Sequence, residues 1–128
     1  MAFCKILDGA MGSELIRRGL ELPERIWSAD ANLSHPELVL EIHREYVEAG
    51  ADYITANTFR TTPRPYSKGG KRPDAEKRAK ESMKIAVENA KEVAGDSVKV
   101  LGSIAPLEDC YSPKLFPGKE TAITEFHQ

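Results

Sequence analysis

Short β-type runs alternate with long helical patterns along this chain, and this alternation restricts its fold more than any other feature. The β-type runs are residues 3–8, 51–59 and 98–105, which are rich in apolar and β-branched residues. A helical pattern follows each run, and the last pattern begins near Lys119 and is still in progress at Gln128. Because strands joined by helices form right-handed βαβ units, the sequence predicts an α/β fold with a parallel sheet.

Two long helices have clear sequence boundaries. The first is expected over residues 35–49, where Ser34–Glu37 has the form of a capping box and Gly50 can end the helix. The second should begin at Pro73, keep an apolar stripe along one face and end at Gly95. These helices should cover the sheet.

The length and composition of the chain limit what it can be. Its 128 residues are fewer than the roughly 250 of a complete (β/α)8 barrel. A 41% hydrophobic content, a 30% charged content and a net charge of -2 indicate a globular domain without general affinity for nucleic acid or anionic membranes. No apolar run reaches about 18 residues and no secretory leader is evident, so a cytoplasmic location is expected.

Polar residues stand where each predicted strand ends. The three exits are Asp8-Gly9, Asn57-Thr58-Phe59 and Gly102–Pro106. Because ligands of parallel α/β folds bind at the carboxyl ends of the strands, these exits should form one site for a polar small molecule. The prediction is that Asp8, Asn57 and Ser103 converge at this edge of the sheet.

The first exit suits both ends of an amino acid. Backbone amides in the Gly9–Gly12 turn can bind a carboxylate at the start of a short helix, and Asp8 can bind an ammonium group. The alternative is that the glycines only form the turn and that Asp8 only caps the helix.

Other polar and aromatic residues also have two interpretations. Asn57 and Thr58 either bind substrate or lock neighbouring loops. Trp27, the single tryptophan, is either a core residue, the favoured interpretation, or a wall of the site. The histidines show no metal-binding spacing and are expected to be solvated: His35, His43 and His127.

Neither a metal site nor a nucleic-acid surface is predicted. Cys4 and Cys110 have no CxxC or Cys/His spacing and are interpreted as free thiols. The basic cluster from Arg60 to Lys80 has few interleaved aromatic residues and is followed by acidic ones. It is interpreted as a solvated loop and helix face.

Several segments taken together resemble the homocysteine S-methyltransferase family. Each is weak alone, but their order and spacing are specific: Ile6–Leu15, Trp27–Ala29, Pro36–Val39, Ile42–Tyr46, Glu48–Asp52, Thr55–Arg60 and Gly102–Pro106. The resemblance implies the N-terminal three βα units of a (β/α)8 TIM-type barrel, incomplete in this chain. Residues 1–128 would then be the N-terminal segment of a homocysteine-binding barrel domain, truncated in the helix after the third strand.

The resemblance also implies an activity. Family members transfer a methyl group from S-methylmethionine, betaine or a methylated folate to the thiol of homocysteine, which gives methionine. A bound Zn²⁺ converts that thiol into a thiolate nucleophile. By position, Asp8 and Gly9 resemble the contact to the amino-acid end of homocysteine, and Asn57, Thr58 and Ser103 resemble pocket residues at the next two exits.

One part of the family pattern is missing. The zinc cysteines of the family lie in Gly-x-Asn-Cys and Gly-Gly-Cys-Cys segments, and neither segment occurs in this sequence. We therefore predict no catalytic residue and no metal ligand here, an inactive chain when alone, and self-association through an open barrel edge. Two alternatives remain: a small α/β module that binds phosphate or an amino acid at the Gly9–Gly12 turn, and a self-associating structural remnant of a half-barrel.

Overall fold

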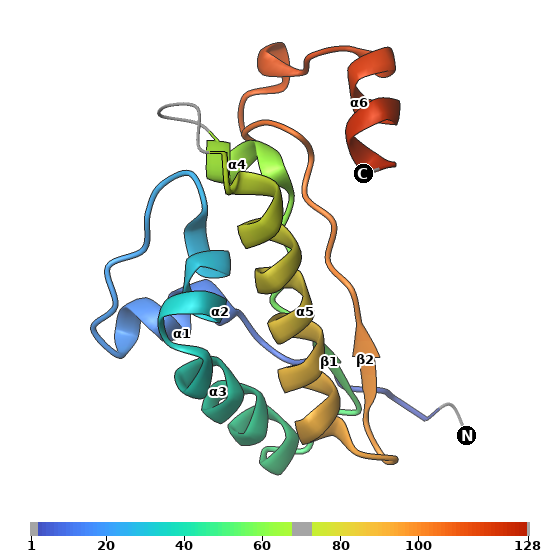
Figure 1. Cartoon of the computed structure of the whole chain (residues 1–128). Coiled ribbons are helices and arrows are strands. Elements are labelled where there is room, and N and C mark those ends of the chain that lie inside the picture. The colour runs from blue at the N-terminus through green and yellow to red at the C-terminus, as the bar shows by residue number, and fades with distance from the viewer. Residues whose placement is uncertain (1–2, 68–72, 128) are drawn as a thin grey trace.

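The computed structural model describes residues 3–67 and 73–127, and helices dominate it (Figure 1). No helix in these two ranges is long and apolar enough to cross a membrane. In chain order the elements are α1 (Met11–Arg17), the 3-10 helix η1 (Trp27–Asp30), α2 (Ala31–Ser34), α3 (Pro36–Glu48), β1 (Tyr53–Thr55), α4 (Pro63–Ser67), α5 (Ala75–Ala94), β2 (Lys99–Leu101), the 3-10 helix η2 (Pro113–Leu115) and α6 (Lys119–Phe126).

The strands run parallel, as the alternation of patterns predicts. β1 pairs with β2 so that Ile54 lies opposite Val100. The first predicted strand is reduced to one parallel bridge between Leu7 and Tyr53, on the other edge of β1. The Asp8 amide donates to the Tyr53 carbonyl at 2.9 Å. The three runs therefore lie side by side in the predicted order, although each pairs over fewer residues than its β-type run.

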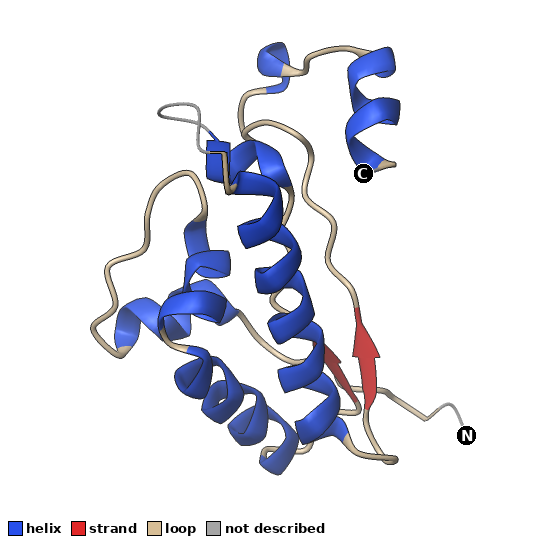
Figure 2. Cartoon of the chain, in the orientation of Figure 1, coloured by secondary structure: helices blue, strands red, loops and turns tan. Residues whose placement is uncertain are grey.

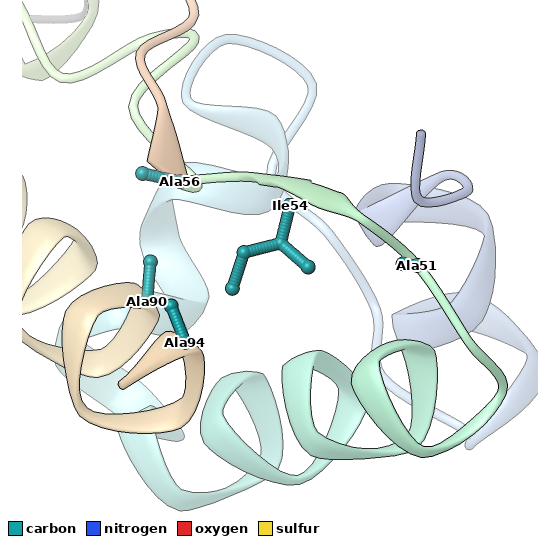
Figure 3. Close-up of a cluster of buried hydrophobic side chains, with 5 residues drawn as sticks. All are labelled: Ala51, Ile54, Ala56, Ala90 and Ala94. Atoms are coloured by element: carbon teal, nitrogen blue, oxygen red, sulfur yellow. The ribbon is translucent and has the colours of Figure 1, made fainter. Parts of the chain in front are cut away.

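Helices α3 and α5 cover one face of this small sheet (Figure 2). Ile54 points from β1 into the helix layer and is completely buried. Small residues surround it, including Ala90 and Ala94 of α5 (Figure 3). Because an alanine side chain is only a methyl group, α5 can lie close against the strand and bury Ile54 between small residues.

The opposite face of the sheet has no helix on it among the described elements (Figure 2). Leu7, which is bridged to Tyr53, is 56% exposed, and Leu101 of β2 is 41% exposed. Because side chains alternate along a strand, these residues point away from the layer that holds Ile54. The sheet therefore has one buried face and one apolar face that is open.

Both long helices begin and end within two residues of the predicted bounds. Gly50 and Gly95 both adopt positive φ and follow the last residues of α3 and α5. The predicted capping box is wrong, because Ser34 is the last residue of α2 and its hydroxyl donates to the Asp30 carbonyl at 3.0 Å. His35 precedes α3 instead and makes no capping hydrogen bond through its side chain.

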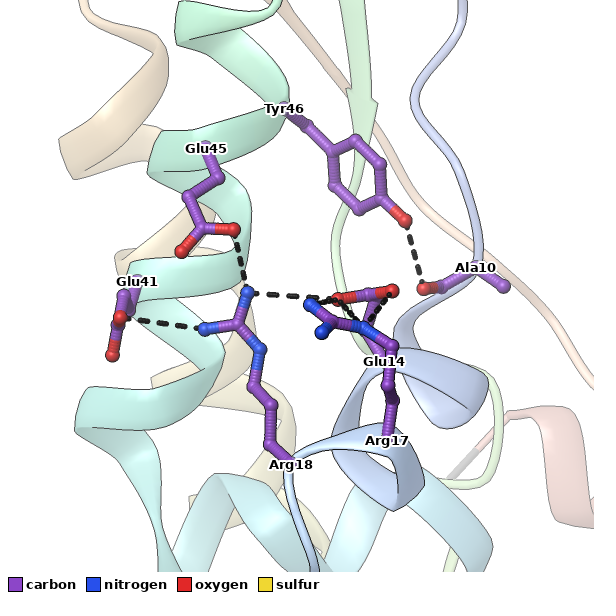
Figure 4. A network of polar contacts seen from close by, with 7 residues as sticks. All are labelled: Ala10, Glu14, Arg17, Arg18, Glu41, Glu45 and Tyr46. Carbon is purple, nitrogen blue, oxygen red and sulfur yellow. Dashed lines mark hydrogen bonds and ion pairs between the residues drawn. The ribbon is translucent and has the colours of Figure 1, made fainter.

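Ion pairs fasten α1 to α3. The guanidinium of Arg18 lies 2.6 Å from a carboxylate oxygen of Glu45, 3.3 Å from Glu41 and 3.5 Å from Glu14 (Figure 4). The Arg18 side chain is only 14% exposed, whereas the neighbouring Arg17 is 66% exposed and pairs with Glu14 within α1. Arg18 therefore attaches α1, the short helix that follows the first exit, to α3.

Candidate functional site

Asp8 ends the first strand and continues its pairing through the side chain. The carboxylate accepts hydrogen bonds from the Thr55 amide at 2.8 Å and from the Thr55 hydroxyl at 3.0 Å. A backbone carbonyl normally takes that position in a parallel ladder, so the carboxylate replaces it where the backbone turns away. Asp8 is half-buried, and a carboxylate has about four acceptor positions, so it can accept further donors.

The helix-capping alternative for Asp8 is wrong. The residue that precedes α1 is Ala10, and no side chain caps that helix. Asp8 instead joins the first strand to β1 through Thr55. The sequence pattern gave no sign of this bond, because Thr55 lies 47 residues away along the chain.

Gly9 allows an aromatic ring of α3 to lie directly on the first exit. A Cβ atom at Gly9 would lie 2.6 Å from the hydroxyl oxygen of Tyr46 and 2.9 Å from its ring. That hydroxyl donates to the Ala10 carbonyl at 3.0 Å (Figure 4). Any larger residue at position 9 would displace Tyr46, so this glycine is needed for close approach rather than for an unusual φ.

Gly12 has the same relation to Trp27. A Cβ atom at Gly12 would lie 2.5 Å from the indole nitrogen. Trp27 is 40% exposed, so the favoured interpretation of it as a core residue is wrong. Its φ is +57°, a left-handed conformation that is strained for a bulky residue and costs about 1–3 kcal/mol. Trp27 is an exposed wall over the turn that begins at Asp8.

The second and third exits are joined by one hydroxyl group. Thr58 Oγ1 donates to the Ser103 carbonyl at 2.8 Å and accepts from the Ser103 amide at 2.9 Å. The Thr58 hydroxyl is therefore engaged on both sides. The Ser103 hydroxyl, in contrast, has no hydrogen-bond partner among residues 3–67 and 73–127, and the side chain is partly exposed.

Asn57 does not converge with Asp8 and Ser103, which corrects the sequence prediction. It is only 4% exposed, and its amide donates to the Ser28 carbonyl at 2.7 Å and to Asn32 Oδ1 at 2.9 Å. The regular strand ends at Thr55, and the Thr58 amide then donates to the Ala56 carbonyl in a tight turn. This turn breaks the alternation of side chains and directs Asn57 into the helix layer.

His43 is the clearest residue that the sequence interpretation missed. It was expected to be solvated, but its side chain is completely buried and neither ring nitrogen has a hydrogen-bond partner within the described residues. Burial lowers the pKa of His43, and the negative charge of Asp8 acts in the opposite direction. Its position on the same helix face as Val39, Ile42 and Tyr46 could have identified it as buried.

Two clefts lie among the loops that follow β1 and β2. One, of about 570 Å³, is mainly apolar and includes Thr58 and Ser103 with Phe59, Met83 and Phe126. The other, of about 820 Å³, is lined largely by charged residues, including Arg60, Arg64 and Asp109. Asp8 and Gly9 line neither cleft. The structure thus brings Thr58 and Ser103 together at one cleft, whereas Asp8 contacts Thr55 of β1.

The basic cluster is not simply a solvated surface. Arg64 is 21% exposed and pairs with Glu108 at 2.7 Å and with Glu125 of α6. It therefore joins α4 to the chain that follows β2. Lys77 and Lys80 are exposed, as expected, and Lys68, Lys71 and Arg72 lie outside the described residues.

The described residues do not fit the zinc ion that the resemblance implies. In residues 3–67 and 73–127 no group of three or more His, Cys, Asp or Glu side chains could hold a metal ion. Cys4 and Cys110 are both exposed free thiols. Since tight zinc sites use at least three protein ligands, no chemical step is assigned to zinc in this chain.

A family model described as homocysteine S-methyltransferase matches residues 5–128. The chain belongs to the homocysteine S-methyltransferase family. Homocysteine S-methyltransferase 4 of Zea mays is 35% identical over 86 residues, which are 66% of this chain and 25% of that protein. Selenocysteine Se-methyltransferase of Brassica oleracea var. italica is 36% identical over 84 residues, which are 65% of this chain and 24% of that protein.

A solved structure agrees with this membership. The metallated form of the homocysteine methyltransferase MmuM from Escherichia coli superposes with a TM-score of 0.61 and 28% identity, covering 80% of this chain and 38% of that one. The chain spans about a quarter of the length of the curated relatives it matches. The family and the parallel α/β architecture are therefore shown.

Proposed function

We propose that this chain forms the homocysteine-binding part of a methyltransferase of its family. The reaction would move a methyl group from S-methylmethionine, betaine or a methylated folate to the homocysteine thiol and give methionine. The two plant relatives are named for methyl transfer to homocysteine and to selenocysteine, which share an amino-acid end. In this proposal the three parallel runs are the first βα units of a (β/α)8 barrel.

The observation that carries the proposal is the fixed carboxylate at the first exit. Thr55 holds both oxygens of Asp8, so the group cannot turn away from the carboxyl edge of the sheet. The remaining acceptor positions suit the ammonium group of an amino acid, because a charge-assisted hydrogen bond is stronger than a neutral one. Gly9 has no side chain of its own, so the turn beside Asp8 can pack directly against the ring of Tyr46.

The other predicted contacts have unequal support. Ser103 has an unengaged hydroxyl at the third exit, whereas the Thr58 hydroxyl already bridges two exits. The substrate contact predicted for Asn57 remains a prediction, but both of its amide hydrogens are used within the protein. We therefore propose Asp8, Gly9 and Ser103 as the principal contacts.

The alternative of a phosphate-binding module has less support. Its proposed site is the Gly9–Gly12 turn, yet the ring of Tyr46 lies on Gly9 and the indole of Trp27 lies on Gly12. Inorganic phosphate, titrated in parallel with homocysteine, distinguishes the two functions.

The experiment is calorimetric titration of the chain with L-homocysteine. Asp8→Asn should weaken binding about tenfold or more, since it removes a charge-assisted hydrogen bond. Asp52→Asn is the matched control, because Asp52 also joins the first strand to the β1 region, accepting from the Ile6 amide at 2.9 Å, but lies before β1. Equal affinity of Asp8→Asn and the unaltered chain would refute the proposal.

A further inference from the structure

The strained turn at Trp27 is held by side chains from other parts of the chain. Among the described residues, Trp27 is the only one other than glycine with a positive φ. The two residues that follow it, Ser28 and Ala29, are 6% and 1% exposed. Strain of this kind persists only when surrounding contacts determine the backbone, so the contacts to this turn are informative.

Two consecutive carbonyls of the turn accept hydrogen bonds from buried side chains. Asn57, which follows β1, donates to the Ser28 carbonyl at 2.7 Å. Ser82 of α5 donates to the Ala29 carbonyl at 3.1 Å. The turn is thus attached to the strand layer and to the helix layer directly after the strained residue.

Asn32 connects these two attachments. Its amide donates to the Asn57 carbonyl at 2.9 Å and to the Ser82 hydroxyl at 3.0 Å, and its oxygen accepts from the Asn57 amide at 2.9 Å. Asn32 and Ser82 are completely buried. A buried polar network in which each amide is engaged is rigid and specifies one arrangement of its members.

The network contacts the two residues that follow Trp27, and the indole itself lies against Gly12. Trp27 is 40% exposed, yet its indole nitrogen is so close to Gly12 that a single methyl group there would overlap it. An exposed aromatic side chain that is held in one position suits a binding site. Because the side chain is already ordered in the free protein, less conformational entropy is lost when a ligand binds.

We infer that Asn57 is a positioning residue: through Asn32 and Ser82 it holds the Trp27 turn so that the indole forms a fixed wall beside the homocysteine site proposed at Asp8. This inference rests on the proposed homocysteine site. It gives Asn57 a role different from the direct substrate contact that its place at a strand exit suggests. The residue acts on the first exit although it follows the second strand.

The single tryptophan makes the inference directly testable by fluorescence. In Asn57→Ala, the Trp27 emission should shift to longer wavelength and acrylamide quenching should increase, because the turn loses its attachment. Gly12→Ala should change the emission in the same direction, because the added methyl group would displace the indole. Asn89→Ala is the matched control, since Asn89 of α5 donates to the Pro36 carbonyl at 3.0 Å and does not contact the turn.

Titration with L-homocysteine separates positioning from a purely structural role. Asn57→Ala should bind about tenfold more weakly, the effect of one ordinary buried hydrogen bond, while Asn89→Ala keeps the affinity of the unaltered chain. Far-UV circular dichroism establishes that each variant is folded. If Asn57→Ala does not fold, Ser82→Ala carries the same test, with changes in the same direction.

The outcomes are distinct. Unchanged emission and quenching in a folded Asn57→Ala or Ser82→Ala variant would overturn the inference. Changed emission with unchanged homocysteine affinity would also overturn it, because the position of Trp27 would then have no effect on homocysteine binding. An unaltered chain that binds no homocysteine would instead refute the proposed function. The fluorescence measurements would still show whether Asn57, Asn32 and Ser82 hold Trp27 in place.

Discussion

The two faces of the sheet differ in how tightly their side chains are packed. On the helix-covered face, Ile54 is completely buried, and the alanines of α5 packed beside it are buried as well. On the opposite face, Leu7 and Leu101 are about half exposed. Stability should therefore depend mainly on the covered face, and the open face should be available for association.

The largest effect is expected from a cavity on the covered face. Ile54→Ala should lower the free energy of unfolding by about 2–5 kcal/mol, because the deleted atoms are completely buried. Leu101→Ala, the matched change on the open face, should cost less than about 1 kcal/mol. Urea unfolding measures both values. Equal costs would show that the two faces are packed alike.

The open face should cause self-association, which we also propose for this chain. An apolar sheet face in water favours contact with a second copy. Sedimentation velocity at micromolar concentration should show species larger than a monomer, and Leu101→Lys should shift them to monomer. Ile16→Lys serves as the control, since Ile16 is 48% exposed on α1 and lies outside the sheet. A monomeric unaltered chain would contradict the prediction.

Lowering the pH should reduce the free energy of unfolding through His43, which is buried on α3. Its pKa is lowered by burial, so the folded chain favours the neutral ring, whereas the unfolded chain takes up a proton below about pH 6.5. Stability from this residue is therefore present above that pH and is lost as the pH falls below it. His43→Leu should reduce this dependence in urea unfolding over a pH series.

The same variant tests the unsatisfied ring nitrogens. Replacing a buried polar group that has no hydrogen-bond partner by an apolar one of similar size should leave stability at neutral pH equal or higher. His35→Leu provides the control for the same replacement at an exposed position. A marked loss of stability in His43→Leu at neutral pH would mean that the imidazole has a polar contact that stabilises the fold.

The smallest effect is expected from the ion pairs between α1 and α3. Arg18→Ala should lower the melting temperature more than Arg17→Ala, because Arg18 connects two helices whereas Arg17 pairs within one. High salt should reduce the difference only in part, since the carboxylates of Glu41 and Glu45 are about half exposed but the Arg18 side chain is largely buried. Thermal unfolding followed by circular dichroism measures it, and equal melting temperatures would show that the attachment of α1 depends on apolar packing alone.

The sequence predicted the architecture because its signals are local. Alternating β-type runs and helical patterns indicated the parallel order of the first strand, β1 and β2, and glycines marked the ends of α3 and α5. The positions of Asp8, Gly9, Thr58 and Ser103 at the strand exits follow from the same local patterns. Each of these inferences needs only a few neighbouring residues, since backbone periodicity and turn chemistry are properties of short segments.

Only the tertiary structure decided what the polar and aromatic side chains contact. The sequence determined that Asn57 follows a strand, but a tight turn after Thr55 directs it to Ser28 and Asn32. It determined that His43 lies on a helix, but packing buried the ring. Trp27 became an exposed wall because Gly12 admits its indole. These contacts join residues that are far apart in the chain, and spacing along a sequence does not specify which distant side chains meet.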